Sequence, residues 1–205
     1  MSAFAADNWM PILSRLNSIL LRSEYWKGYI AQEALAMGWC GLSPATESEI
    51  CETERQLGVA FPPSYRSFFA AANGWRPFSG FIERLFSMRE IERFQSADPE
   101  DLELIQRYFQ EDDLSDEEYL DYQTPRRVEA LRHRYYPKSI LVGKGWDGGG
   151  GELILLNSHI VSPDGEWEAI FFANWIPGNR RFRSFRDLVE DSIDTTERFE
   201  ATRSP

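Results

Sequence analysis

The sequence has few of the residues that usually build metal sites or disulfide scaffolds. Among 205 residues, only two are cysteines, Cys40 and Cys51, and only two are histidines, His133 and His159. Two cysteines in a chain of this size do not form a disulfide framework, and neither belongs to a CxxC motif. Because the histidines lie far apart in sequence and no ligand set is visible, we predict that the protein holds no structural metal. We expect both thiols to be buried or unreactive, in a reducing compartment.

Long apolar segments are also missing. No run approaches the roughly 18 apolar residues that a membrane-spanning helix needs. The N-terminal segment MSAFAADNWM lacks the basic region followed by an apolar one that defines a secretory signal. We therefore expect a cytoplasmic protein without a membrane partner.

Positive charge is in deficit. The chain has 33 acidic and 22 basic residues, a net charge of −11. A negatively charged protein repels the phosphate backbone of nucleic acids, so we predict no direct nucleic-acid binding. The same charge would speed the encounter with a basic protein. The alternative is that the acidic charge only keeps the protein soluble. A hydrophobic content of 42% and a length near 200 residues indicate a single globular domain with extensions.

The first 41 residues predict an N-terminal helical extension. Asp7 or Asn8 can cap a helix that accepts Pro11 in its first turn. A second helical stretch, from Glu24 to Ala36, ends at Gly38.

The next segment predicts a pair of helices. Thr46 and Glu49 form a T-x-x-E capping box, and Gly58 can end that helix in the left-handed conformation. Pro63 pre-forms the first turn of a second helix, which Asn73-Gly74 terminates.

An acidic helical elaboration spans residues 98–121. Asp98-Pro99 begins one helix, and Ser115 and Glu118 can form a capping box at the start of a second, shorter helix. The junction between them carries six acidic residues: Glu111, Asp112, Asp113, Asp116, Glu117 and Glu118. This cluster is either a solvated helix face or a docking surface for a cationic partner.

The last third of the chain predicts an antiparallel meander. Short aliphatic runs at 139–142, 152–156 and 168–175 are typical of strands. Ser184 and Asp187 can form a capping box at the start of a closing helix. Residues after Asp194 are polar, and we expect a frayed tail over 193–205. Helices, then a meander, then one helix indicate an α+β fold.

The chain carries no recognisable catalytic or cofactor signature. Residues 143–148 match G-x-G-x-x-G, but a dinucleotide site needs a helix to follow, and a strand-like run follows here. Asp147 and Glu152 could act as paired carboxylates, but a solvated turn and strand edge is the favoured interpretation of both. We predict no catalytic residues, no cofactor and no metal.

A short arginine-rich segment offers a competing interpretation. Arg180, Arg181, Arg183 and Arg186 interleave with Phe182 and Phe185, a pattern that can contact phosphates and stack on bases. The overall negative charge opposes it, and pairing of these arginines with local acids is favoured.

Four segments together resemble the SMI1/KNR4 (SUKH) family: 45–50, 56–58, 61–68 (FPPSYRSF) and the closing 73–74. Residues 139–157 and 184–188 are similar to the family's glycine turn, following strand and closing helix. The resemblance covers about residues 42–192. It implies a SUKH-like antiparallel sheet with flanking helices, used as a binding module: bacterial members look like immunity proteins that neutralise a toxin, often a nuclease, and fungal ones occur in regulatory scaffolds.

The hypothesis from the sequence is therefore a non-catalytic immunity protein that binds a basic toxin domain. The six acidic residues would steer the partner, and an exposed Trp146 would anchor the interface. The alternatives are a regulatory or scaffolding adaptor without a toxin partner, and an enzyme whose site forms only in three dimensions.

Overall fold

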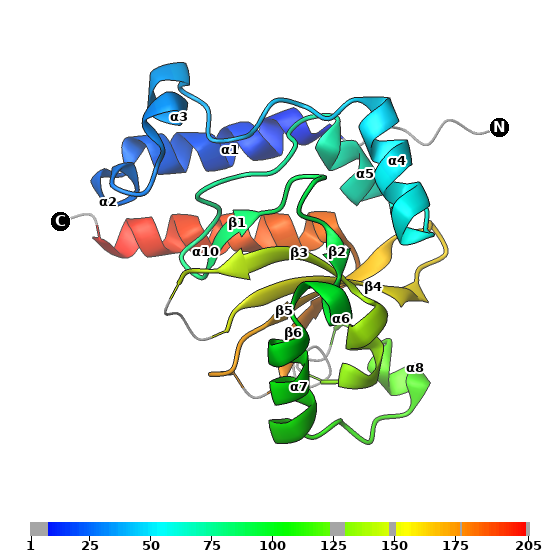
Figure 1. The fold of residues 1–205 in the computed structure, drawn as a ribbon. Helices are drawn as coiled ribbons and strands as arrows, with labels where there is room; N and C mark the ends of the chain where they lie inside the picture. Colours follow the sequence, from blue (N-terminus) through cyan, green and yellow to red (C-terminus); the bar gives the residue numbers. More distant parts are fainter. Residues whose placement is uncertain (1–7, 124–129, 148–150, 177, 204–205) are drawn as a thin grey trace.

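The computed structural model describes residues 8–123, 130–147, 151–176 and 178–203. It confirms the predicted α+β fold, because one antiparallel sheet is flanked by helices on both faces (Figure 1). The described helices are α1 (Trp9–Arg22), α2 (Glu24–Lys27), α3 (Gln32–Met37), α4 (Glu47–Leu57), α5 (Pro63–Phe69), α6 (Phe94–Ala97), α7 (Pro99–Tyr108), α8 (Asp116–Tyr119), the 3-10 helix η1 (His133–Lys138) and α10 (Phe185–Arg203).

The described strands are β1 (Ile82–Leu85), β2 (Glu92–Arg93), β3 (Ile140–Gly145), β4 (Leu153–Val161), β5 (Trp167–Phe172) and β6 (Asn179–Phe182). Their order in the sheet is β1-β3-β4-β5-β6, and β2 also pairs with β3. Each pairing is antiparallel, and the central strands β3 and β4 bury long aliphatic runs between the two helical layers.

Helix ends follow the predicted caps closely. The Asn8 side chain accepts the Met10 N–H at 3.3 Å at the start of α1. The Thr46 hydroxyl accepts the Glu49 N–H at 3.2 Å, and the Glu49 carboxylate accepts the Thr46 N–H at 2.8 Å. Gly58 ends α4 with φ +67°, a left-handed conformation that glycine adopts without strain.

The N-terminal helices share one core with the rest of the chain. Trp9 is 1% exposed, and its ring lies 5.4 Å from Phe68 of α5 and 5.8 Å from Phe185 of α10. Its indole N–H donates to the Ser64 carbonyl oxygen at 3.0 Å. Helix α1 therefore covers the same apolar layer as α5 and α10. The boundaries 1–41, 42–192 and 193–205 stay a prediction.

Several elements differ from the sequence-based expectation. The stretch from Glu24 to Ala36 forms two short helices with a turn after Gly28, and α5 stops at Phe69, before Asn73-Gly74. Strands β1, β2 and β6 were not predicted, because their sequences show no alternation of apolar and polar residues. These strands form because they pair with neighbouring strands.

The expected frayed tail after Asp194 is wrong, since α10 continues to Arg203. Two tertiary contacts explain the longer helix. Thr196 is 3% exposed in the core, and the Phe199 ring lies 5.9 Å from Tyr25 of α2. Packing against α2 thus orders a segment whose sequence is polar.

Candidate functional site

Much of the predicted acidic cluster is engaged in contacts within the protein. Glu111 accepts the Arg134 backbone N–H at 2.5 Å and lies 3.1 Å from the Arg134 guanidinium and 3.3 Å from His133 Nδ1. The Asp112 carboxylate accepts the Leu131 N–H at 2.7 Å. These two acids tie the elaboration to the chain before β3.

Asp116 and Glu118 also have structural partners. Asp116 lies 2.6 Å from the guanidinium of Arg132, which is 2% exposed and lies 4.1 Å above the Tyr119 ring. Glu118 completes the predicted capping box of α8. The Asp116 side chain nevertheless stays 85% exposed.

The outward negative surface of this segment is consequently smaller than the sequence indicated. Asp113 and Glu117 are exposed, and together with the exposed carboxylate of Asp116 they face solvent around the start of α8. These three acids are the part of the cluster that a partner could contact without first breaking the contacts of Glu111 and Asp112.

Trp146 is half-buried, which corrects the expectation of an exposed anchor. Its indole N–H donates to the Ser79 carbonyl oxygen at 3.2 Å, and its ring lies 4.9 Å from Tyr29 and 6.4 Å from Trp26. Trp146 directly follows β3, and this end of β3 lies toward the left in Figure 1, whereas α8 lies at the lower right. The structure does not bring Trp146 and the acidic cluster together.

The arginine-rich segment pairs with local acids, as the favoured interpretation predicts. Arg180 lies 2.9 Å from Asp191, and Arg186 lies 3.0 Å from Glu190. Arg181 is 3% exposed in β6. These arginines therefore do not form a continuous exposed stripe for phosphates.

Arg181 belongs to a buried polar cluster beneath α8. It donates to Glu168 of β5 at 2.8 Å and to the Tyr119 carbonyl oxygen at 2.6 Å. Glu168 also accepts from the Tyr119 hydroxyl at 3.2 Å, the Tyr122 hydroxyl at 3.0 Å and Asn157 at 2.9 Å.

Burial raises the pKa of both tyrosine hydroxyls, with the nearby Glu168 carboxylate adding to the effect. The side chains of Glu168 and Arg181 are fully enclosed, so no substrate reaches them; the cluster holds α8 onto β5 and β6.

Close packing around β3 explains the two glycines of the G-x-G-x-x-G match that the structure describes, Gly143 and Gly145. A side chain on Gly145 would meet Glu152 Oε2 at 2.6 Å, and one on Gly143 would lie 3.0 Å from the Arg84 carbonyl oxygen. Both glycines allow β3 to pack closely against its neighbours. β4 follows the turn in place of the helix that a dinucleotide site needs, and Gly148 lies outside the described residues.

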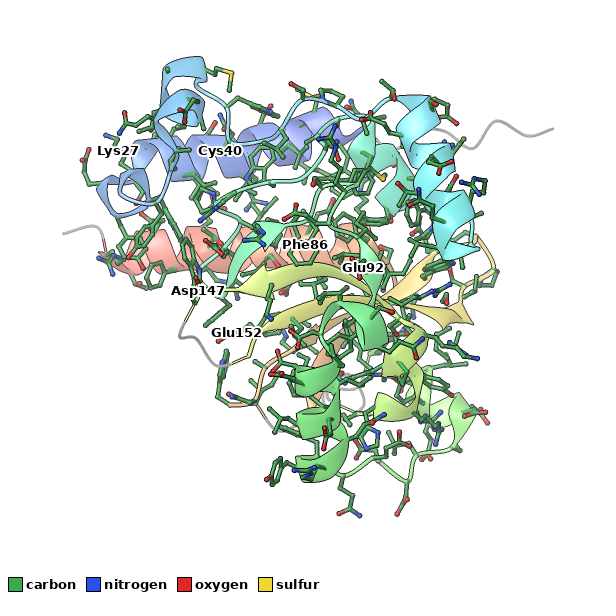
Figure 2. The ribbon with its side chains drawn as sticks, viewed as in Figure 1. Lys27, Cys40, Phe86, Glu92, Asp147 and Glu152 are labelled. Carbon is green, nitrogen blue, oxygen red and sulfur yellow. The ribbon has the colours of Figure 1, made fainter. Side chains whose placement is uncertain are left out.

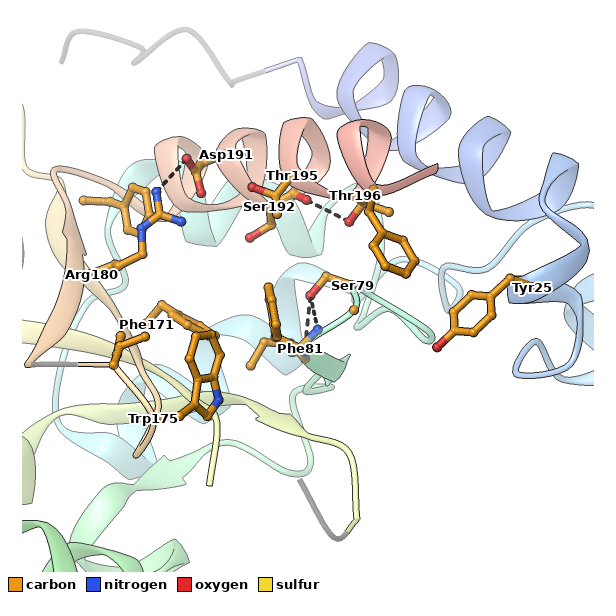
Figure 3. Close-up of a pocket in the computed structure, with 15 residues that line it drawn as sticks. Tyr25, Ser79, Phe81, Phe171, Trp175, Arg180, Asp191, Ser192, Thr195 and Thr196 are labelled. Atoms are coloured by element: carbon orange, nitrogen blue, oxygen red, sulfur yellow. Dashed lines mark hydrogen bonds and ion pairs between the residues drawn. The ribbon is translucent and has the colours of Figure 1, made fainter. Parts of the chain in front are cut away.

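An aromatic groove that was not predicted from the sequence lies between α10 and the adjacent end of β5. Its volume is about 340 Å³ (Figure 3). The residues that line it are Tyr25, Ser79, Gly80, Phe81, Ile82, Phe171, Trp175, Ile176, Arg180, Phe182, Asp191, Ser192, Thr195, Thr196 and Phe199. We call this the aromatic groove.

One wall of the aromatic groove is a cluster of rings. Phe81 lies 5.1 Å from Trp175 and 6.1 Å from Phe171. The Trp175 indole N–H donates to Glu152 Oε1 at 2.8 Å. The sequence predicted Trp175 only as the end of a strand. Because exposure depends on what other segments leave uncovered, no local pattern could have identified the groove.

The thiols and acids of the described residues show no metal site. Within the described ranges, no group of three or more His, Cys, Asp or Glu residues is arranged to hold a metal ion. Cys40 and Cys51 are both free. Burial raises the pKa of the Cys40 thiol to about 11, whereas Cys51 is exposed. In the same ranges, no helix is long and apolar enough to cross a membrane.

The chain matches a known protein family. The family model of the SMI1/KNR4 family (SUKH-1) matches residues 44–193. That range begins just before α4 and ends within α10, so it includes the sheet, the acidic cluster and the glycine turn. A comparison with curated proteins found no match.

Proposed function

The chain belongs to the SMI1/KNR4 (SUKH-1) family, and we propose on this basis that it is a non-catalytic immunity protein that neutralises a basic toxin domain by binding it. Family membership supports an immunity-protein-like role in general, and it is the observation that carries the proposal. The net charge of −11 supports the choice of a basic partner.

Inhibition would proceed by stoichiometric occlusion. A nuclease binds phosphate groups and therefore presents a basic surface. An acidic protein that covers this surface excludes the substrate by charge and by volume, and needs no chemistry of its own. Electrostatic attraction would mainly raise the association rate.

We propose that the exposed acids near α8 form part of the contact surface. Asp113 and Glu117 are exposed, and the Asp116 side chain stays 85% exposed although it pairs with Arg132. Glu111 and Asp112 instead hold the segment to the chain before β3. Trp146 would contribute only through the exposed edge of its half-buried ring.

Co-expression tests the function directly. The toxin domain encoded beside this gene would be produced alone and together with this protein, scoring growth and co-purification. We expect rescue of growth and a stable complex. Purification of the complex without rescue, or no complex with any neighbouring toxin, contradicts the immunity role and favours a regulatory adaptor.

Charge reversal tests the contact surface. The double variant Asp113→Lys/Glu117→Lys should bind the toxin roughly tenfold or more weakly, with a shallower dependence of affinity on salt, because attraction turns into repulsion. The matched control is Glu33→Lys/Glu92→Lys, which makes the same charge change at two other exposed positions. Equal weakening in both variants would reduce the effect to net charge and remove the surface assignment, leaving the immunity role intact.

A further inference from the structure

We infer that a groove beside α7 receives a lysine side chain of a protein partner, with the aliphatic stem on its apolar walls and the ammonium at Asp101. This inference rests on the proposed binding function and adds one defined contact to it. The contact is separate from the aromatic groove and from the exposed acids near α8.

The groove lies between α7, the first residue of β4 and the last residue of β5, on the side of the sheet opposite α1 and α10 (Figure 1). Its volume is about 280 Å³. Small-molecule pockets have volumes of about 300–1,000 Å³, so this one suits a single side chain better than a cofactor. We call it the α7 groove, and its walls include Asp101, Leu104, Tyr108, Phe109, Leu153 and Phe172.

The walls of the α7 groove offer an apolar surface that is partly open to solvent. Leu104 is 47% exposed and Tyr108 is 71% exposed. The inner wall is fixed, because the Phe109 ring lies 5.1 Å from the ring of the buried Phe172. Lysine buries its methylene stem along such surfaces while its ammonium stays at a polar group.

The polar group at this groove is a carboxylate. Among the described residues, Asp101 is the one charged side chain that lines the α7 groove. It lies 3.7 Å from Lys144 Nζ, but the same ammonium makes a closer contact with Asp98, so two carboxylates share one cation. The Asp101 side chain is 31% exposed, and a second cation can therefore reach it.

The pKa of Asp101 agrees with this shortage of positive charge. Burial raises the pKa of the Asp101 carboxyl, the neighbouring Asp98 carboxylate raises it further, and Lys144 opposes the effect only in part. A point charge on an unbranched stem suits this carboxylate, because one of its oxygens already faces Lys144. A guanidinium would need both oxygens for a bidentate contact.

The aromatic groove lacks such an unbalanced charge. Arg180 pairs there with Asp191 at 2.9 Å, and the Arg203 guanidinium lies 4.5 Å from the Tyr25 ring. Its charges select neither a cationic nor an anionic partner.

The surroundings of the α7 groove are also negative. Residues 98–121 contain eleven acidic residues and one arginine. Of these acids, Glu100, Asp113 and Glu117 form no ion pair within the part of the chain that the structure describes. Asp147 is exposed at the end of the sheet where β4 begins (Figure 2). A cationic segment is attracted to this region, and an anionic one is repelled.

Peptide titration tests the charge and the stem without any toxin. The probes are three capped peptides with two alanines on each side of a central lysine, norleucine or glutamate. Norleucine keeps the aliphatic stem of lysine and lacks its ammonium. Binding at low salt is followed by NMR through the backbone amide signals of Leu104, Tyr108 and Asn174, which line the groove.

We expect the lysine peptide to bind about three- to fivefold more tightly than the norleucine peptide, the size of effect typical of a partly exposed ion pair. The glutamate peptide should leave the signals unchanged. Asp101→Asn should remove the preference for lysine over norleucine. Glu100→Gln, which removes the same charge from α7 outside the groove, should keep it.

A second variant tests the apolar wall. Leu104→Ala/Tyr108→Ala should weaken the binding of both the lysine and the norleucine peptide, because the stem loses its contact surface. Leu120→Ala, at a position that is 48% exposed outside the groove, should not. Thermal unfolding confirms that each variant is folded.

Several outcomes would overturn the inference. One is an absence of binding by the lysine peptide, and another is equal binding of the lysine and norleucine peptides. Equal loss of the preference in Asp101→Asn and Glu100→Gln would show that binding follows net charge alone. Unchanged binding to Leu104→Ala/Tyr108→Ala would place the peptide outside the groove.

The toxin separates this inference from the proposed function. If a neighbouring toxin is bound and neutralised equally well by the wild type and by Asp101→Asn/Tyr108→Ala, the groove assignment fails and the immunity role stands. If no toxin is neutralised while the lysine peptide binds as expected, the groove assignment stands and the immunity role fails.

Discussion

At the scale of single residues, Glu168 and Arg181 form an ion pair whose side chains are both 0% exposed. Burying two charges is costly, and this pair is tolerated because the remaining oxygens and N–H groups are hydrogen-bonded to Tyr119, Tyr122 and Asn157. The pair therefore acts as one unit with its neighbours.

Removing one member of that unit should be far more damaging than removing both. We expect Arg181→Met to lower the free energy of unfolding by about 3–5 kcal/mol, because it leaves Glu168 charged and buried. Arg181→Met/Glu168→Leu should recover a large part of the loss. Urea unfolding measures both.

Arg180→Ala is the control for this comparison. It breaks an exposed pair with Asp191 and should cost at most about 1 kcal/mol. A cost for Arg181→Met as small as that of Arg180→Ala would show that the buried cluster is not the anchor we describe.

At the scale of secondary-structure elements, the segment around α8 depends on side chains that come from elsewhere. A helix of four residues has little stability of its own. The buried Arg132 holds it through Asp116 and through its position above the Tyr119 ring. The presentation of the outward acids thus depends on one cation beneath them.

Arg132→Met should therefore loosen this segment selectively. We expect faster amide hydrogen exchange over residues 111–120, with exchange in β4 and β5 unchanged, because the sheet keeps its own pairing. Hydrogen exchange with mass spectrometry measures this. Arg134→Met, at a half-exposed position nearby, should show a smaller effect. Faster exchange throughout the sheet would contradict a local role for Arg132.

At the scale of the whole molecule, one helical layer is formed by α1 and α10, the first and the last described helices. Helix α1 packs on α10 above the sheet, while α6, α7, α8 and η1 lie on the other side (Figure 1). The N-terminal helices are part of this layer, although the family match begins only at residue 44.

Substitution of Trp9 tests that arrangement. Trp9→Ala should lower the free energy of unfolding by about 3–5 kcal/mol in a single cooperative transition, since a ring in contact with α5 and α10 is lost. Met10→Ala, at a position that is 50% exposed, should change it by less than about 0.5 kcal/mol. A separate early transition with an unchanged main transition would show that residues 1–41 fold independently of the core.

The sequence by itself determined the features that depend on near neighbours in the chain. The Thr46–Glu49 box, Gly58 and the Ser115–Glu118 box were all predicted correctly, and Asn8 is one of the two caps predicted for α1, because a cap is a contact between residues two to four positions apart. The family signature, the α+β class and the strand in place of a helix after the glycine turn could also be predicted, because each depends on the local sequence of the segments involved.

Only the tertiary structure decided which side chains are buried and which face solvent. Arg181 is enclosed by Tyr119, which lies 62 positions away, and β1, β2 and β6 depend on partner strands distant in sequence. The same holds for the exposure of Phe81 and Trp175 and for the half-burial of Trp146. A charge or a ring has the same local pattern in either environment, and its surroundings arise only when distant segments pack together.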